Sequence, residues 1–162
     1  MSIVVREIRV PDDIDAVAGL YEQTVRWHSE QWPQDMRRPD LASLRTDLAA
    51  DPPTAAADRC FLVAERAGRV VGLISASSRP APDQGMDRYD GPVVYIGDIV
   101  VSQEARRAGV GARLMAAVED WARANGAATI TLQVHTGNTA ASALYAQQGF
   151  RTVDIRMRKD LG

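Results

Sequence analysis

The residue types best suited to holding a ligand lie in one short loop at residues 106–111, with the sequence RRAGVG. The loop follows a β-branched run, Val93 to Val101, and an apolar-periodic segment beginning near Gly109 predicts that a helix comes next. Glycines let a bulky anion approach the backbone, and the first turn of a helix offers unpaired N–H donors at the positive end of its dipole. With two arginines at its rim, the loop is typical of a site for the phosphates of a nucleotide-like ligand.

Two common phosphate-binding motifs fit this loop poorly. A P-loop needs a Lys-Ser/Thr pair after its second glycine, whereas Ala112 and Arg113 follow Gly111 here. A dinucleotide-binding fingerprint needs a third glycine where Leu114 stands, and it needs an acidic residue for the ribose where the next strand ends in His135. A dinucleotide-binding protein is therefore the least favoured of the functions considered.

A second segment with chemical potential lies downstream, from Asn138 to Phe150. Asn138 can cap the start of a helix, and Ala141 is small enough to let a neighbouring chain approach. Tyr145 carries an ionisable phenol, although a tyrosine on a helix is often only a half-buried packing residue. The residue pattern alone leaves both interpretations of Tyr145 open.

Together the two segments resemble the GNAT superfamily of N-acetyltransferases. Arg106, Gly109 and Gly111 match its acetyl-CoA signature, Gln/Arg-x-x-Gly-x-Gly/Ala, and the pattern from Asn138 to Phe150 is similar to its late helix and the strand that follows. The resemblance covers residues 93–153. It implies an acetyltransferase that moves the acetyl group of acetyl-CoA to a primary amine of a small molecule or protein, by direct attack in a ternary complex. A non-catalytic acyl-CoA-binding regulatory module is the alternative.

The resemblance also implies roles for single residues. Tyr145 would donate to the departing sulfur of coenzyme A, and Asp98 lies where the family often carries an acidic residue, although position 97, a glutamate base in some members, is Gly97 here. Backbone N–H groups around Val100 and Val101, where the family's strand bulges, would stabilise the thioester oxygen. The implied contacts with the coenzyme are Ile99, Val100, Val101, Arg106, Arg107, Ala108, Gly109, Val110, Gly111, Ala112, Asn138, Ala141 and Tyr145.

Transfer to an amine requires a group that accepts a proton, because an alkylamine with a pKa of about 10.4 is almost all ammonium at neutral pH. The sequence offers two candidates and does not choose between them. Asp98 would need desolvation or an intervening water to act as the base, whereas His135 has a better-matched intrinsic pKa. Each also has a structural interpretation, since Asp98 could bond to the phosphate loop and His135 could be an ordinary loop histidine.

Other chemistries find little support. The only cysteine, Cys60, opens an apolar run, which is typical of a buried thiol and excludes an internal disulfide. With His28 and His135 it lacks the spacing of a metal site, so no metal is expected. A formal net charge of -2 argues against nucleic-acid or anionic-membrane binding. No membrane-spanning run or signal peptide is expected, which favours the cytoplasm.

The length of 162 residues predicts one domain, residues 1–162, that positions all of these groups. The expected fold is α/β, with flanking helices on a mixed, largely antiparallel sheet of about six to seven strands, as in the GNAT family. Strands are predicted at 3–10, 59–65, 69–77, 93–101 and 128–134, with a final strand carrying Arg151, Arg156, Arg158 and Lys159. Helices are predicted from Pro11 to Trp27, from Asp40 to Leu48, from Gly109 to about Asn125, and after Asn138.

Two further segments could shape the acceptor side of the site. Aromatic and apolar residues gather near the end of the first helix, although at this density they are usually core residues. They are Trp27, His28, Trp32 and Met36. The loop at 78–91 carries Asp83, Asp87 and Asp90, which could attract a cationic amine or simply face solvent. The sequence gives neither the acceptor nor the acyl-chain preference, and a homodimer is suggested by the family resemblance alone.

Overall fold

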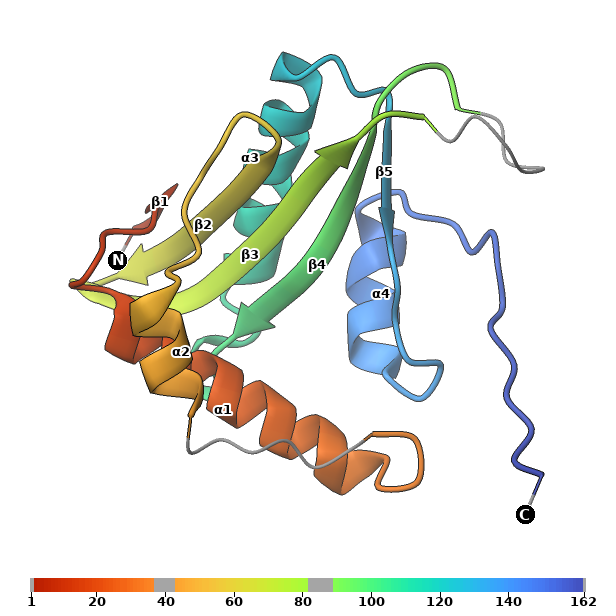
Figure 1. Ribbon diagram of the computed structural model, residues 1–162, viewed down its shortest axis with the longest axis horizontal. Coiled ribbons are helices and arrows are strands. Elements are labelled where there is room, and N and C mark those ends of the chain that lie inside the picture. Colours follow the sequence, from red (N-terminus) through yellow and green to blue (C-terminus); the bar gives the residue numbers. More distant parts are fainter. Residues whose placement is uncertain (1, 37–42, 82–88, 162) are drawn as a thin grey trace.

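The computed structural model describes residues 2–36, 43–81 and 89–161, which form alternating strands and helices (Figure 1). The strands are β1 (Ile3–Glu7), β2 (Arg59–Arg66), β3 (Arg69–Arg79), β4 (Val93–Val101) and β5 (Thr129–Leu132). The helices are α1 (Ile14–Gln31), α2 (Leu44–Ala50), α3 (Val110–Ala124) and α4 (Thr139–Gln147), and a 3-10 turn, η1 (Gln103–Ala105), precedes α3.

The strands form one sheet in the order β1-β2-β3-β4-β5. The first three pairings are antiparallel, and β4 pairs with β5 in parallel, so the expected mixed, largely antiparallel sheet is confirmed. The expectation of six to seven strands was wrong, because the described residues form five. The missing element is the final strand: residues 150–161 are extended but pair with no neighbour, and an extended segment becomes a strand only when another edge pairs with it (Figure 1).

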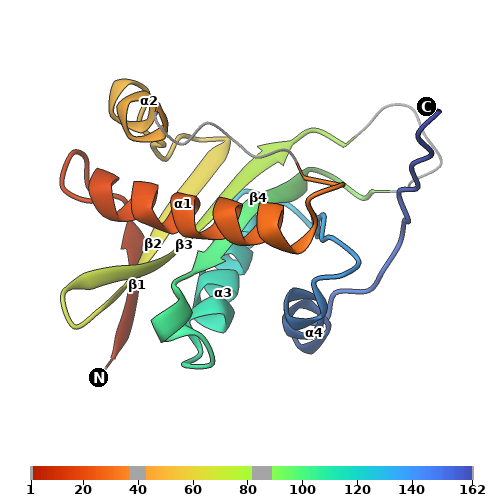
Figure 2. The ribbon, with the colours of Figure 1, turned by 90° about the horizontal axis from the view of Figure 1, so that it is seen from below.

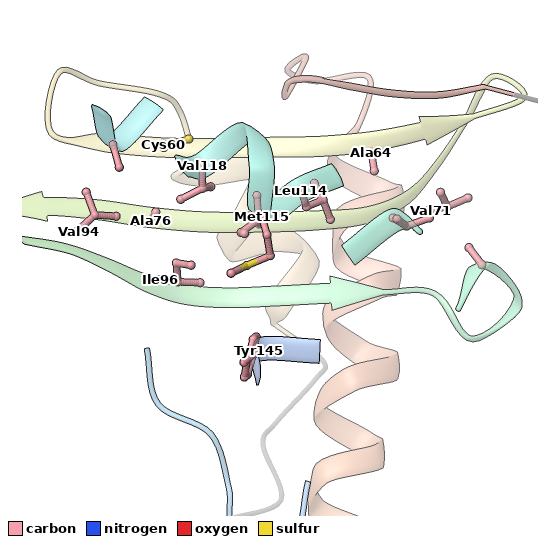
Figure 3. Close-up of a cluster of buried hydrophobic side chains, with 14 residues drawn as sticks. Cys60, Ala64, Val71, Ala76, Val94, Ile96, Leu114, Met115, Val118 and Tyr145 are labelled. Carbon is pink, nitrogen blue, oxygen red and sulfur yellow. The ribbon is translucent and has the colours of Figure 1, made fainter. Parts of the chain in front are cut away.

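A helix covers each face of the sheet, and each makes its own core (Figure 2). On one face, the apolar stripe of α3 packs on β2, β3 and β4 in the larger cluster, which Figure 3 shows. On the other face, Val17 and Leu20 of α1 pack with Phe61, Leu73 and Val100. The two faces are called the α3 side and the α1 side below.

Most predicted elements are present with shifted ends. β1 stops at Glu7 rather than Val10, because the chain turns there and Asp13 accepts a hydrogen bond from the Arg9 N–H at 2.7 Å. α1 continues to Gln31, four residues beyond its predicted end. α2 was predicted from Asp40, and the first part of that segment, up to residue 42, lies outside the described residues. None of the described helices combines the length and apolar character needed to cross a bilayer.

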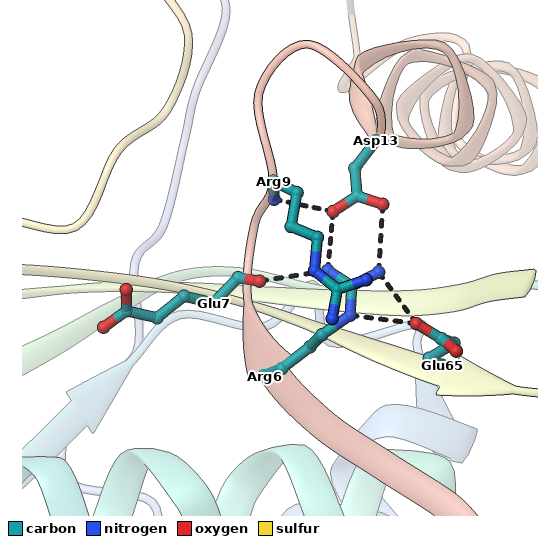
Figure 4. Close-up of polar contacts among 5 residues, drawn as sticks. All are labelled: Arg6, Glu7, Arg9, Asp13 and Glu65. Carbon is teal, nitrogen blue, oxygen red and sulfur yellow. Dashed lines mark hydrogen bonds and ion pairs between the residues drawn. The ribbon is translucent and has the colours of Figure 1, made fainter. Parts of the chain in front are cut away.

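A nearly buried ion-pair cluster joins the start of α1 to the sheet (Figure 4). Arg6 of β1 donates two hydrogen bonds to the Asp13 carboxylate, at 2.6 and 3.0 Å, and one to Glu65 of β2 at 2.9 Å. The Arg6 guanidinium therefore lowers the pKa of Asp13 below its usual value. These hydrogen bonds of Arg6 fix where α1 begins. They thereby also fix which face of α1 lies against β4.

Candidate active site

The site begins where β4 and β5 separate. The parallel pairing covers only Val93–Ile96 against Thr129–Leu132, and beyond this point β4 continues alone to Val101 (Figure 1). Over residues 97–101 the edge of β4 that faces away from β3 therefore has no strand beside it. An exposed strand edge offers backbone N–H and C=O groups to any extended chain that lies along it.

A bulge at Gly97 decides which side chains face which layer. In the pairing with β3, Ser75 lies opposite Asp98 and Ala76 lies opposite Ile96, so Gly97 is the unpaired residue. The bulge was expected around Val100 and Val101, but these two residues pair regularly with Leu73 and Gly72. That expectation was wrong. Glycine suits this position because a Cβ atom there would lie 3.0 Å from the Ser75 Oγ atom, which is a tight contact.

The bulge reverses the alternation of side chains along β4. Ile96 belongs to the α3-side core, whereas Val100 belongs to the α1-side core, although an even spacing would keep both on one face of a regular strand. Asp98 consequently faces α1. There its Oδ2 atom accepts hydrogen bonds from Tyr21 of α1 at 3.2 Å and from Ser75 of β3 at 3.0 Å. No sequence pattern indicated a role for Tyr21 or Ser75.

The loop after β4 forms the predicted anion-receptive turn. Arg107 has a φ of 61° and Gly109, the residue before α3, has a φ of 82°, which favours glycine. The first N–H of this helix with a backbone partner is that of Arg113, which donates to the Gly109 carbonyl at 3.1 Å. The N–H groups of Val110 to Ala112 are therefore open at the positive end of the helix, as phosphate binding requires.

The two signature glycines have different structural reasons. A Cβ atom on Gly109 would meet nothing within 4 Å, so glycine is needed there for the left-handed backbone. A Cβ atom on Gly111 would lie 3.0 Å from the Leu144 Cδ2 atom, so this glycine lets α4 pack against the first turn of α3. The loop thus fixes the position of the helix that carries Tyr145.

Helix α4 is capped as predicted, since the Asn138 side chain accepts a hydrogen bond from the Ala141 N–H at 3.1 Å. Tyr145 is 9% exposed and lies on the α3 side in the cluster that also holds Ile96 and Met115 (Figure 3). Its ring is 5.9 Å from that of Phe150. Burial raises the pKa of Tyr145, so its phenol keeps its proton at neutral pH.

His135 is engaged at both ring nitrogens. Its Nδ1 atom accepts a hydrogen bond from the Gly137 N–H at 3.1 Å, which places the ring proton on Nε2, where Asp35 accepts it at 3.2 Å. The ring also stacks on Trp32, with centroids 4.0 Å apart. The lone pair that would accept a proton is therefore occupied by the backbone.

The residues near the end of α1 form an aromatic cluster that consists of Trp27, His28, Trp32 and His135. It is half-buried and belongs to neither core, so the interpretation of these aromatics as core residues was wrong. The Arg106 guanidinium lies over the Trp27 ring, 5.8 Å from its centroid, and both residues line a groove of about 390 Å³ with Glu22 and Glu30. In the loop at 78–91, residues 82–88, which include Asp83 and Asp87, lie outside the described residues.

The structure brings the candidate groups to one edge from two sides. Asp98 is on the α1 side, Tyr145 is on the α3 side, and the unpaired edge of β4 lies between them, with the phosphate loop at its end. Within the described part of the chain, no three metal-ligating side chains gather. Cys60 is buried, which raises its pKa to about 11 and makes it a poor nucleophile.

Comparisons with known proteins agree with this geometry. Residues 17–150 match the sequence profile of the acetyltransferase (GNAT) family. Aminoglycoside N(6')-acetyltransferase type 1 of Serratia marcescens is 29% identical over 93% of this chain and 95% of its own length. IAA acetyltransferase of Azospirillum brasilense is 31% identical over 84% of this chain and 77% of its own length.

Solved structures share the fold at low sequence identity. A mutant of the BH1408 protein from Bacillus halodurans superposes with a TM-score of 0.78 at 20% identity, covering 98% of this chain and 99% of that one. The aminoglycoside N-acetyltransferase AAC(6')-Iy in complex with CoA gives 0.71 at 21% identity, covering 98% and 94%. Because the family profile matches most of its length, the chain belongs to the acetyltransferase (GNAT) family.

Proposed function

We propose that this protein transfers the acetyl group of acetyl-CoA to a primary amine in a ternary complex. The observation that carries the proposal is the unpaired edge of β4 leading directly into an anion-receptive turn, between a buried tyrosine and an exposed carboxylate. Family membership and a structural neighbour that holds CoA support it. The named relatives are acetyltransferases, so a non-catalytic acyl-CoA-binding module gains no support.

In this proposal the coenzyme lies along the α3 side of the β4 edge. The open N–H groups of α3 and the exposed Arg106 and Arg107 hold the pyrophosphate, with Ala108 at the turn. The pantetheine arm is an extended chain with amide groups, and it bonds to the backbone of β4 between Ile99 and Val101. Asn138 and Ala141, at the start of α4, are the contacts with the coenzyme proposed from this helix.

Tyr145 acts when the carbon–sulfur bond breaks. The amine nitrogen attacks the thioester carbonyl carbon, the tetrahedral intermediate collapses, and the thiolate of CoA leaves with the bonding electrons of the carbon–sulfur bond. The nitrogen loses its second proton in this step, and that proton balances the thiolate, so the products are the amide and the free thiol of CoA. Full proton transfer from a phenol near pKa 10 to a thiolate near 8.5 is uphill by roughly 2 kcal/mol, so a hydrogen bond from Tyr145 during collapse is the contribution expected. Backbone N–H groups on the unpaired edge of β4, in the stretch from Ile99 to Val101, stabilise the oxyanion.

Asp98 rather than His135 receives the proton of the acceptor. The Nδ1 atom of His135 accepts the Gly137 N–H and its Nε2 atom faces Asp35, so His135 positions the loop before α4. Asp98 is exposed and on the α1 side, where an acceptor can approach without crossing the coenzyme. A single water between the two groups can carry the proton from the acceptor to Asp98.

The proposed acceptor is a cationic amine. The groove beside the phosphate loop is lined by Glu22 and Glu30, whose carboxylates can pair with ammonium groups. Arg26 and Arg106 line the same groove, so it suits an acceptor that carries hydroxyl groups as well as amines. Aminoglycosides are the acceptors named for one relative and one structural neighbour, which makes them the first compounds to test.

A thiol-release assay tests the function directly. The protein is mixed with acetyl-CoA and, in separate wells, neamine, kanamycin, spermidine or a lysine-containing peptide, and free CoA is measured with a thiol reagent. The proposal expects release that depends on at least one amine, with the acetylated amine identified by mass spectrometry. Tight acetyl-CoA binding with no amine-dependent release over a wide amine panel would favour the non-catalytic module.

We further propose that the chain forms one domain that acts as a homodimer in the cytoplasm, where acetyl-CoA is available. Four of the exposed large apolar side chains among the described residues lie after α4, and three alternate as on a strand: Val153, Ile155 and Met157. The edge of β5 is also unpaired, so a second copy could cover both. Light scattering of wild type and of Ile155→Asp tests this, because a dimer through this segment would become a monomer in the variant. An unchanged dimer would exclude the segment.

A further inference from the structure

Asp98 has an asymmetric environment. Two hydroxyl groups, from Tyr21 on α1 and Ser75 on β3, donate to the same oxygen, Oδ2, at 3.2 and 3.0 Å. The Asp98 N–H in turn donates to the Ser75 Oγ atom at 3.0 Å. Among the described residues, no side chain or backbone group donates to Oδ1. One oxygen is therefore held by the protein, and the other faces outward.

The bulge at Gly97 is what makes this arrangement possible. Without it, Asp98 would point to the α3 side with Ile96, away from Tyr21. The Ser75 hydroxyl fills the space beside Gly97 that a side chain would occupy, so the same hydroxyl orients Asp98 and excludes a larger residue at position 97. Asp98 thus lies one residue after the position at which some family members carry a glutamate. The hydroxyl groups of Tyr21 and Ser75 hold its carboxylate in place.

Tyr21 is a fixed donor and not a group that shares the proton. Its ring packs beside the α1-side core, and burial together with the charge of Asp98 raises its pKa far above the ordinary value. The phenol keeps its proton at every pH at which an enzyme works. Its hydrogen bond with the carboxylate therefore restricts the rotation of Asp98 without competing for the proton of the acceptor.

We propose that Tyr21 is a positioning residue for acetyl transfer: with Ser75 it holds Oδ2 of Asp98, so that Oδ1 is presented to the ammonium group of the acceptor. This inference rests on the proposed function. In the reaction an N–H bond of the ammonium breaks, the proton forms an O–H bond at Oδ1, directly or through water, and the electron pair remains on nitrogen for the attack on the thioester. Tyr21 and Ser75 keep their protons.

The substitution Tyr21→Phe removes one donor and keeps the ring. We expect kcat/KM for neamine or spermidine, whichever reacts faster, to fall about tenfold, because a hydrogen bond to a charged group is lost. The KM for acetyl-CoA should stay within about twofold of wild type.

Tyr95→Phe serves as the matched control. Tyr95 lies on the same strand as Asp98 but before the bulge, and its ring lies 5.7 Å from the Arg79 guanidinium. The control should match wild type in kcat/KM and in its pH profile. Equal losses in both variants would overturn the assignment, because they would show a general effect of removing a tyrosine hydroxyl.

A double-mutant cycle separates positioning from packing. In an Asp98→Asn background, Tyr21→Phe should cost less than about twofold in kcat/KM, because the carboxylate it positions is already gone. Full additivity of the two substitutions would contradict the proposal. If Tyr21→Phe fails to fold, Ser75→Ala takes its place in the same cycle, since Ser75 donates to the same oxygen.

An acceptor-free measurement distinguishes this inference from the proposed function. In a carbon-13 NMR spectrum recorded at pH 7, the signal of the Asp98 carboxyl group should shift in Tyr21→Phe, because the hydrogen bond to Oδ2 is lost, and it should not shift in Tyr95→Phe. An unchanged signal in Tyr21→Phe would overturn the inference even if acetyl transfer is confirmed. A shifted signal with no amine acetylated would leave the contact intact while the proposed function fails.

Discussion

In the proposed mechanism the chemistry depends most on Tyr145, whose burial and position on α4 agree with a role at the departing sulfur. Tyr145→Phe should lower kcat severalfold to about a hundredfold, because the phenol donates only during collapse of the tetrahedral intermediate. Acetyl-CoA affinity, measured by calorimetry, should be nearly unchanged. Unchanged turnover in a steady-state assay would remove Tyr145 from the mechanism.

The burial of Tyr145 also predicts the direction of its effect on the pH dependence of kcat. Because its pKa is raised, the phenol stays protonated through the neutral range, and any alkaline loss of kcat that it causes must lie above about pH 10. Stopped-time assays from pH 7 to 10.5 check this, with Tyr145→Phe as the control that lacks the group. A fall in kcat centred near pH 8 that disappears in Tyr145→Phe would show that the phenol titrates too early for this account.

The two candidate bases give opposite expectations. Asp98→Asn should lower kcat/KM by about a hundredfold and abolish the acidic limb of its pH profile, because a proton acceptor is lost. His135→Ala should keep the limb, because the ring nitrogens of His135 already bond to Gly137 and Asp35. Loss of the acidic limb in His135→Ala alone would reverse the assignment.

At the residue scale, the sequence indicated the groups but not their surroundings. The signature around Arg106 and the helix with Tyr145 are local patterns, which a single sequence can show. The partners of Asp98 come from positions 21 and 75, and only the sheet register and the bulge at Gly97 bring them together. Local spacing therefore identified Asp98 but could not choose between it and His135.

At the scale of elements, the start of α3 forms the phosphate turn and also packs against α4, where Gly111 lies beside Leu144. Gly109→Val should weaken acetyl-CoA binding, because the left-handed backbone at φ 82° is strained for a β-branched residue. Gly111→Val should lower kcat more than coenzyme affinity, because its side chain meets Leu144 and displaces the helix that carries Tyr145. Calorimetry and steady-state kinetics on the two variants separate these effects.

A third glycine provides the control for those variants. Gly19 lies within α1, and a Cβ atom there would meet nothing within 4 Å. Gly19→Ala should raise the free energy of unfolding by about 0.5–1 kcal/mol and leave coenzyme affinity unchanged. If Gly109→Val binds acetyl-CoA as tightly as Gly19→Ala does, the phosphate turn is not where the coenzyme binds.

The ends of the helices and strands, and the pairing of the strands, depend on tertiary contacts that local sequence patterns do not show. The apolar runs predicted β2, β3 and β4, but the final strand predicted through Arg151, Arg156, Arg158 and Lys159 finds no partner among the described residues. Periodicity reports which residues would share a face, and only a neighbouring edge with free N–H and C=O groups turns such a segment into a strand.

At the scale of the whole molecule, the ion pairs around Arg6 connect α1 to the sheet and should dominate the acid response. The lowered pKa of Asp13 means that its contribution to stability is complete above about pH 4 and is lost as the pH falls further. Asp13→Asn should therefore lower the free energy of unfolding by about 2–4 kcal/mol at pH 7, because it leaves Arg6 nearly buried with half its partners.

Asp15→Asn is the control for that stability measurement. Asp15 pairs with Arg45, but both side chains are largely exposed, so the loss should be at most about 1 kcal/mol. Urea titrations at pH 7 and pH 3 check both variants. A gap between wild type and Asp13→Asn that stays constant across this range would contradict the assigned role of the Asp13 charge.

The proposed function consists of one event, the passage of an acetyl group from a coenzyme held on β4 and α3 to an amine held beside Asp98. A quenched-flow experiment with acetyl-CoA radiolabelled in the acetyl group and the fastest amine of the panel follows that group directly. Direct transfer predicts that the label appears in the amine at the rate of thiol release, with no labelled protein at any time. A labelled protein that forms and decays at the turnover rate would show a covalent intermediate and contradict direct transfer.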